Sequence, residues 1–112
     1  MARAGDVVEH PLAGTRTVFL KTACDTHGEL LELDVFMRGG GRVSAEHIHP
    51  NQEERFEVLS GTAHFRMRGR ERDIGIGEKV VIPAGTPHVW GNLGEEEAHL
   101  IAELRPALDL ES

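Results

Sequence analysis

Apolar and polar residues alternate with a period of two in several short runs of this chain. A period of two is typical of a β-strand with one buried face. The apolar positions of three such runs are Leu31, Leu33, Val35 and Met37; Ala63, Phe65 and Met67; and Leu100, Ala102 and Leu104. Glycine-containing turn signals separate the runs. The pattern predicts an all-β chain of eight or nine short strands, with no defined helix, that forms a barrel or a sandwich.

The length and charge of the chain limit its organisation and its partners. Its 112 residues are enough for one domain, which we expect to span residues 1–112. A net charge of −7 disfavours nucleic acid and anionic membranes as partners. A single cysteine, Cys24, excludes an intrachain disulfide and fits a reducing compartment. No secretion signal or membrane span is evident, so we expect a cytoplasmic protein. Because nucleic acid and membranes are disfavoured, we expect its partner to be a small molecule.

His47 and His49 are separated by one residue, and this spacing indicates a metal site. On an extended segment, side chains two residues apart project from the same side, with Cα atoms roughly 7 Å apart. On a helix the same side chains point about 200° apart and cannot share one ion. Because the surrounding sequence alternates as strands do, we expect an extended pair that binds a divalent metal, with Glu54 and His88 as further candidate ligands.

Two glutamates follow the histidine pair, and the alternation distinguishes them. Glu54 shares a face with the apolar residues Phe56 and Val58, whereas Glu53 falls on the opposite face. A carboxylate on an inward face needs a partner, because burying it alone costs several kcal/mol. A metal ion is such a partner. We therefore choose Glu54 as the ligand. We expect Glu53 to be solvated or to contact a metal ligand rather than the metal itself.

With these residues in place, the chain resembles a small single-domain cupin. The first cupin motif is matched by Gly41, His47, His49, Glu54 and Gly61. The second is matched by Gly77, Pro83, Gly85, His88 and Asn92. The resemblance implies a jelly-roll barrel, also called a double-stranded β-helix, in which His47, His49, Glu54 and His88 converge on one metal. It also implies a homodimer, often built through N-terminal strands.

The ligand set restricts the metal without identifying it. Three neutral imidazoles and one carboxylate suit Fe(II), Mn(II), Ni(II) or Co(II), and zinc is an alternative. Four protein ligands leave about two positions of an octahedral ion open to water, oxygen or substrate. We expect Phe56, Met67 and Trp90 to line an apolar substrate pocket beside the metal, although Trp90 is more often a core residue.

Three functions are compatible with such a site, because fold alone does not set the reaction. The first is a dioxygenase-like oxidoreductase that uses the metal and O₂ on a small organic molecule. The second is a metal-dependent isomerase or cyclase, and the third is a module that binds or senses a small molecule without turnover. The chain contains no tyrosine, which excludes a tyrosine acid or base of the kind that sugar epimerases of this fold use. No catalytic residue beyond the metal ligands can be assigned.

The remaining histidines are not spaced in the way that metal ligands usually are. We expect His10, His27, His64 and His99 to be solvated or to lie in loops. Asn92 and Pro83 are expected to shape the turns that orient His88.

Overall fold

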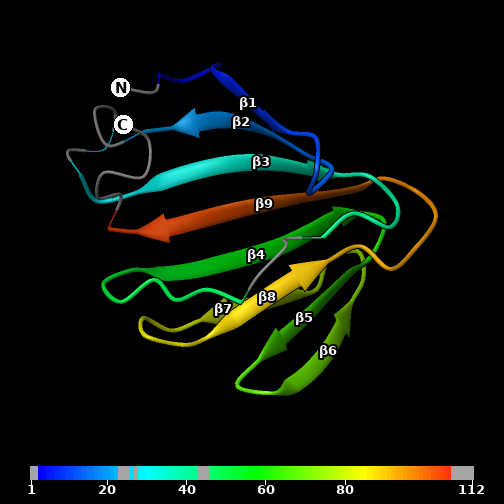
Figure 1. Ribbon diagram of the computed structural model, residues 1–112. Helices are drawn as coiled ribbons and strands as arrows, with labels where there is room; N and C mark the ends of the chain where they lie inside the picture. The colour runs from blue at the N-terminus through cyan, green and yellow to red at the C-terminus, as the bar shows by residue number, and fades with distance from the viewer. Residues whose placement is uncertain (1–2, 23–25, 27, 43–45, 107–112) are drawn as a thin grey trace.

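Nine strands and two antiparallel sheets make up the fold of the computed structural model, which describes residues 3–22, 26, 28–42 and 46–106 (Figure 1). The strands are β1 (Val7–His10), β2 (Thr15–Lys21), β3 (Leu31–Met37), β4 (Glu53–Ser60), β5 (Ala63–Met67), β6 (Arg70–Ile74), β7 (Lys79–Ile82), β8 (His88–Gly91) and β9 (Ala98–Arg105). Their number agrees with the eight or nine expected from the alternation. Cys24 and residues 107–112 lie outside the described residues.

The strands form a large and a small sheet that face each other. The large sheet has the order β1-β2-β3-β9-β4-β7, and the small sheet has the order β6-β5-β8 (Figure 1). The β9 strand, last in the chain, therefore pairs with both β3 and β4. No helix within the described ranges is long and apolar enough to cross a membrane.

The faces predicted from the alternation are the buried ones. In β3, β5 and β9, the apolar positions point into the space between the sheets, and only Leu33 and Met67 among them keep partial exposure. Phe56, Phe65 and Trp90 meet in the middle of this core, with ring centroids 5.1 to 5.6 Å apart. Burying large aromatic side chains against each other contributes strongly to stability.

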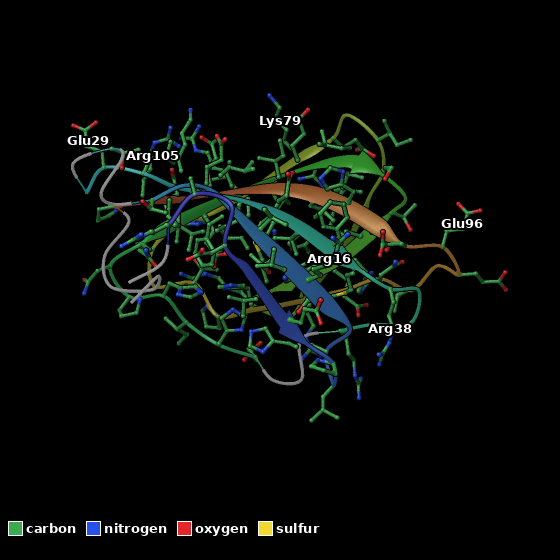
Figure 2. The ribbon with its side chains drawn as sticks, turned by 90° about the horizontal axis from the view of Figure 1, so that it is seen from above. Arg16, Glu29, Arg38, Lys79, Glu96 and Arg105 are labelled. Carbon is green, nitrogen blue, oxygen red and sulfur yellow. The ribbon has the colours of Figure 1, made fainter. Side chains whose placement is uncertain are left out.

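Charged residues cover the outside of the molecule, and in Figure 2 Lys79 and Glu96 point away from its body. On the outer face of the large sheet, Phe36 stacks on His99 with centroids 4.2 Å apart, and the Arg16 guanidinium lies 4.3 Å from the Phe36 ring. A groove of about 130 Å³ also lies on this outer face, where β4, β7 and β9 run side by side. It is separate from the inner face, which carries the candidate ligands.

The expectation that the remaining histidines are solvated or in loops holds only in part for His64 and His99, which are partly exposed but lie in strands. Both lie within strands and are half-buried, and each has a carboxylate partner across the sheet. His64 Nδ1 lies 2.6 Å from Asp73 Oδ1, and His99 Nε2 lies 2.7 Å from Asp34 Oδ1. The sequence could not indicate this, because the partners are 9 and 65 residues away along the chain. His10 is exposed on β1, and His27 lies outside the described residues.

The β1 strand forms one edge of the large sheet, and all four of its residues are exposed. Edge strands carry unpaired backbone groups that can pair with another chain. The homodimer implied by the family resemblance would involve such N-terminal strands, and it stays a prediction.

Candidate metal centre

His47 and His49 lie on the segment that joins β3 to β4, beside the first residues of β8. His47 and His88 form an isolated antiparallel bridge in which each backbone N–H donates to the other's carbonyl at 3.0 Å. The Gly85 N–H donates to the His49 carbonyl, also at 3.0 Å. The histidine pair is therefore extended along β8 as expected, although its described residues pair with β8 only through isolated bridges and form no regular strand.

The close approach of this segment to β8 also depends on Gly91. A second bridge joins Arg42 to Gly91, and a Cβ at position 91 would lie 2.9 Å from the Arg42 Cβ. Any larger residue there would push the two backbones apart. A glycine at this position thus lets the histidine segment reach the inner face of the barrel.

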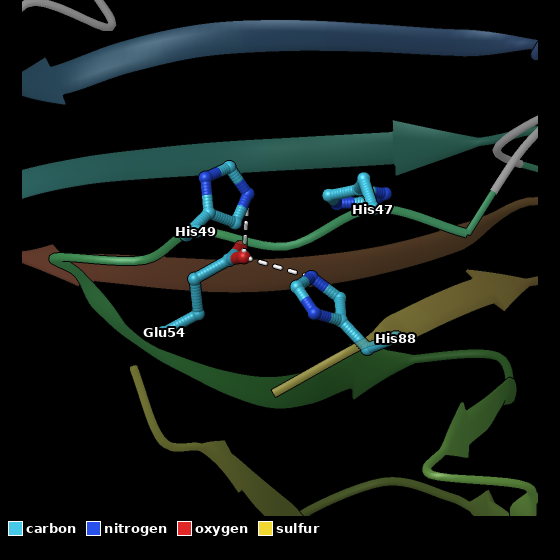
Figure 3. Close-up of side chains that lie close together, drawn as sticks. All are labelled: His47, His49, Glu54 and His88. Atoms are coloured by element: carbon cyan, nitrogen blue, oxygen red, sulfur yellow. Dashed lines mark ion pairs between the residues drawn. The ribbon is translucent and has the colours of Figure 1, made fainter. Parts of the chain in front are cut away.

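The four predicted ligands come together in the structure (Figure 3). One ligand atom from each of His47, His49, Glu54 and His88 lies within 4.8 Å of all the others. Glu54 projects from β4 and His88 from β8, and both are buried, whereas His47 and His49 are half-buried. The inward face chosen for Glu54 from the alternation is confirmed. Glu53 points outward and pairs with Arg55 at 2.9 Å.

Two buried atoms in the cluster point at each other without a hydrogen bond of good geometry. His88 Nε2 lies 3.0 Å from Glu54 Oε1, and both atoms are buried without a hydrogen-bond partner among the described residues. His88 Nδ1 donates to the Thr86 carbonyl at 2.8 Å, so a neutral His88 presents a lone pair at Nε2. Two acceptors that face each other repel unless a proton or a cation lies between them. A divalent metal fits this arrangement, because it would satisfy both atoms at once.

The electrostatics of Glu54 agree with a cation site. Burial raises the pKa of its carboxyl, but the imidazoles of His49 at 2.9 Å and His88 at 3.0 Å outweigh burial and lower that pKa from 4.5 to about 2. Glu54 is therefore a carboxylate at any physiological pH. Burial lowers the pKa of His88, and the neighbouring Glu54 carboxylate and Thr86 carbonyl raise it above 6.5 overall. A metal that binds at Nε2 of His88 competes with a proton for that atom.

The three residues predicted to line a pocket have different surroundings. Phe56 and Trp90 are 4% and 7% exposed and pack within the core cluster. Met67 is half-buried on the same inner face and pairs directly with His88 across β5 and β8. Contact of these side chains with a substrate stays a prediction.

Thr86 belongs to the candidate site, although nothing in the sequence pointed to it. Its carbonyl fixes the His88 tautomer, and it lies between Pro83-Ala84-Gly85 and Pro87, in a turn that the second motif predicts. A backbone acceptor has no side-chain signature, so only the position of this turn could have suggested it.

Comparisons with known proteins agree with this structure. A family model described as a cupin domain matches residues 34–102. A polyketide synthase, CurC from Streptomyces cyaneus, is 34% identical over 70 residues, which are 62% of this chain and 45% of that protein. This chain therefore aligns with less than half the length of that curated relative.

Solved structures share the fold. KdgF from Halomonas sp. superposes with a TM-score of 0.79 at 20% identity, covering 93% of this chain and 88% of KdgF. A predicted oxalate decarboxylase from Thermotoga maritima gives 0.80 at 18% identity, covering 92% of each chain. A putative sugar phosphate isomerase from Acidithiobacillus ferrooxidans gives 0.69 at 24% identity, covering 90% of this chain and 67% of that one. The predicted jelly-roll barrel is confirmed, and identities this low show the fold alone.

Proposed function

The chain belongs to the cupin domain family, and from that premise we propose that it is a metal-dependent enzyme that acts on a small organic molecule. The observation that carries this proposal is a cluster of four ligand atoms in which the buried atoms Glu54 Oε1 and His88 Nε2 lie 3.0 Å apart without a hydrogen bond between them. A purely structural cluster would be expected to satisfy these atoms by hydrogen bonds. Their arrangement instead suits a bound cation.

Each residue of the cluster has a definable part in holding the metal. His47, His49 and His88 would bind through neutral nitrogens, and Glu54 would supply the negative charge that offsets part of the metal's charge. Because His88 Nδ1 donates to the Thr86 carbonyl, the single ring proton of a neutral His88 is on Nδ1, and Nε2 is free to bind a metal. When bound, a divalent metal would supply Lewis acidity, and iron or manganese would add redox chemistry with O₂.

The reaction we propose first is a dioxygenase-like oxidation. Half-burial of His47 and His49 leaves the cluster open on one side, where a small substrate could approach, while Glu54 and His88 are closed off from water. The test begins with elemental analysis of protein purified without added metal. Oxygen-electrode assays of Fe(II)- and Mn(II)-loaded protein then follow over a panel of enols, diketones and catechols. We expect substrate-dependent O₂ uptake that is lost in His88→Ala.

A second reaction, isomerisation or cyclisation through Lewis-acid enolisation, is favoured by one finding. The 34% identical relative is described as a polyketide synthase, a class that handles chains rich in 1,3-dicarbonyl groups. The same panel, followed by product analysis without oxygen, separates the two reactions, because enolisation consumes no O₂. Tight binding of a panel member with no turnover under either condition would instead support a binding module, and absence of bound metal would contradict all three.

A further inference from the structure

A row of four directly paired residues crosses the inner face of the small sheet and its flanking segment. His47 is bridged to His88, His88 pairs with Met67 of β5, and Met67 pairs with Arg70 of β6. Directly paired residues of antiparallel strands project from the same face. Arg70 therefore shares a face with two of the candidate metal ligands. At the usual strand spacing its Cα is roughly 10 Å from that of His88, within reach of one small molecule.

The position of Arg70 in this row is fixed by a tight turn. Arg68 and Gly69 connect β5 to β6 and have φ values of 50° and 78°. Positive φ at both central residues defines the two-residue turn that pairs the flanking residues, here Met67 and Arg70. The Arg68 N–H also donates to the Pro87 carbonyl at 3.2 Å, which attaches the hairpin tip to the residue before His88. The hairpin thus presents Arg70 at a defined place beside the cluster.

The side chain of Arg70 is exposed and available to a ligand. It forms no ion pair or side-chain hydrogen bond with the residues that the structure describes, whereas Arg55 and Arg105 form ion pairs with neighbouring glutamates. The stretch 66–72 holds four arginines, although the whole chain has only 12 lysines and arginines and a net charge of −7. A local concentration of positive charge at this edge would attract an anion that the rest of the surface repels.

We propose that Arg70 binds an anionic group, a carboxylate or a phosphate, of a substrate whose other end chelates the metal at the cluster. A guanidinium suits this task because its planar fork donates two parallel hydrogen bonds to such a group. Met67, between Arg70 and His88, would contact the connecting apolar part of the substrate. This proposal rests on the proposed function and adds a substrate class to it: small acidic carbonyl compounds rather than neutral ones.

The test compares charged and neutral probes on Mn(II)-loaded protein by isothermal titration calorimetry. The carboxylate arm uses 3-oxoglutarate against its dimethyl ester, and the phosphate arm uses dihydroxyacetone phosphate against dihydroxyacetone. The variants are Arg70→Ala, Arg70→Lys and the matched control Arg66→Ala, which removes an equal charge from the outer face of β5. Metal affinity is measured for each variant separately.

We expect Arg70→Ala to weaken the binding of one of the two anionic probes, 3-oxoglutarate or dihydroxyacetone phosphate, by about tenfold. This is the loss expected when one charge-assisted hydrogen bond is removed. Arg70→Lys should restore part of this loss, and neutral probes and metal affinity should be unchanged. Equal losses in Arg70→Ala and Arg66→Ala, or anionic binding unaffected by Arg70→Ala, would overturn the role of Arg70 and leave the proposed function intact. Wild-type protein that binds no metal would contradict the proposed function itself.

Discussion

Glu54 is the residue on which the metal site depends most directly. It is a buried carboxylate whose oxygen lies 2.9 Å from one imidazole and 3.0 Å from another. Replacement by glutamine keeps its shape and removes its charge. Because loss of residues that merely support a ligand already costs about 10- to 100-fold in metal affinity, we expect Glu54→Gln to lose at least about 100-fold. Competition with a metal-sensitive dye measures this affinity.

The matched control for Glu54 is its neighbour on the opposite face. Glu53 is partly exposed and pairs with Arg55, so Glu53→Gln should leave metal affinity within about twofold of wild type, since exposed pairs contribute little. In the metal-free protein, Glu54→Leu should lower the free energy of unfolding, because it removes one partner of a buried pair and leaves His88 without its carboxylate. Equal metal affinity in Glu54→Gln and Glu53→Gln would contradict the ligand assignment.

His64 gives a prediction about pH that does not involve the metal. Asp73 on β6, hydrogen-bonded at 2.6 Å, raises the pKa of His64, and Glu71 adds to this against a smaller opposing effect of burial. A raised pKa stabilises the fold below the unfolded value of 6.5, and this stabilisation is lost as pH rises through the folded value. Asp73→Asn should therefore lower the free energy of unfolding by up to about 1 kcal/mol at pH 6 and by less at pH 8.5. Urea unfolding at both pH values measures the difference, and an equal loss at both would contradict it.

Individual residues show which features of the site can be predicted from the sequence and which cannot. Glu54 could be chosen over Glu53 because alternation along one strand depends only on local geometry. The carboxylate partners of His64 and His99 could not be predicted, because they depend on which strands are neighbours. The place of Arg70 could not be predicted for the same reason, because only the pairing of β5 with β6 puts it on the same face as Met67.

At the scale of elements, the strand faces were predictable and the strand order was not. Alternation marks the buried face of each strand, but it contains no information about which strand lies next to which. The insertion of β9 between β3 and β4 joins segments far apart in the chain. The histidine segment was expected to be extended, and it is, yet it pairs with β8 only at isolated positions.

Asn92 directly follows β8, at the opposite end of that strand from His88, and its side chain forms hydrogen bonds with three other residues. It is fully buried, and its side-chain N–H₂ donates to the carbonyls of Met37 at 3.1 Å and Glu96 at 2.7 Å. Its Oδ1 accepts from the Gly94 N–H at 3.0 Å. Asn92→Ala would leave these groups unsatisfied, so we expect a loss of on the order of 3 kcal/mol in the free energy of unfolding.

Metal affinity should change much less than stability in Asn92→Ala. Four residues of extended chain place Asn92 about 13 Å from His88, too far to alter the ligand geometry directly. Chemical denaturation and metal titration of the same preparation measure the two effects. Asn51→Ala, at an exposed asparagine, is the matched control and should change neither. A large loss of metal affinity with unchanged stability would contradict the structural role of Asn92.

At the scale of the whole molecule, the candidate centre connects the two sheets of the barrel. Glu54 belongs to the large sheet and His88 to the small one, so a metal bound between them acts as a cross-link. A ligand that binds only the folded state stabilises it by about 2.7 kcal/mol at 100 times its dissociation constant. For a domain of this size that corresponds to a rise of about ten degrees in melting temperature.

Removing the metal should therefore lower the melting temperature by about ten degrees, and adding back the metal should restore it. Calorimetry of loaded and chelator-treated wild type measures the shift. In His88→Ala, which lacks one ligand from the small sheet, chelator should cause little further change, because the cross-link is already lost. A chelator effect of equal size in wild type and His88→Ala would show that the stabilising metal binds elsewhere. Because the metal and the unfolding transition are measured on the same molecule, the result holds whatever reaction the site performs.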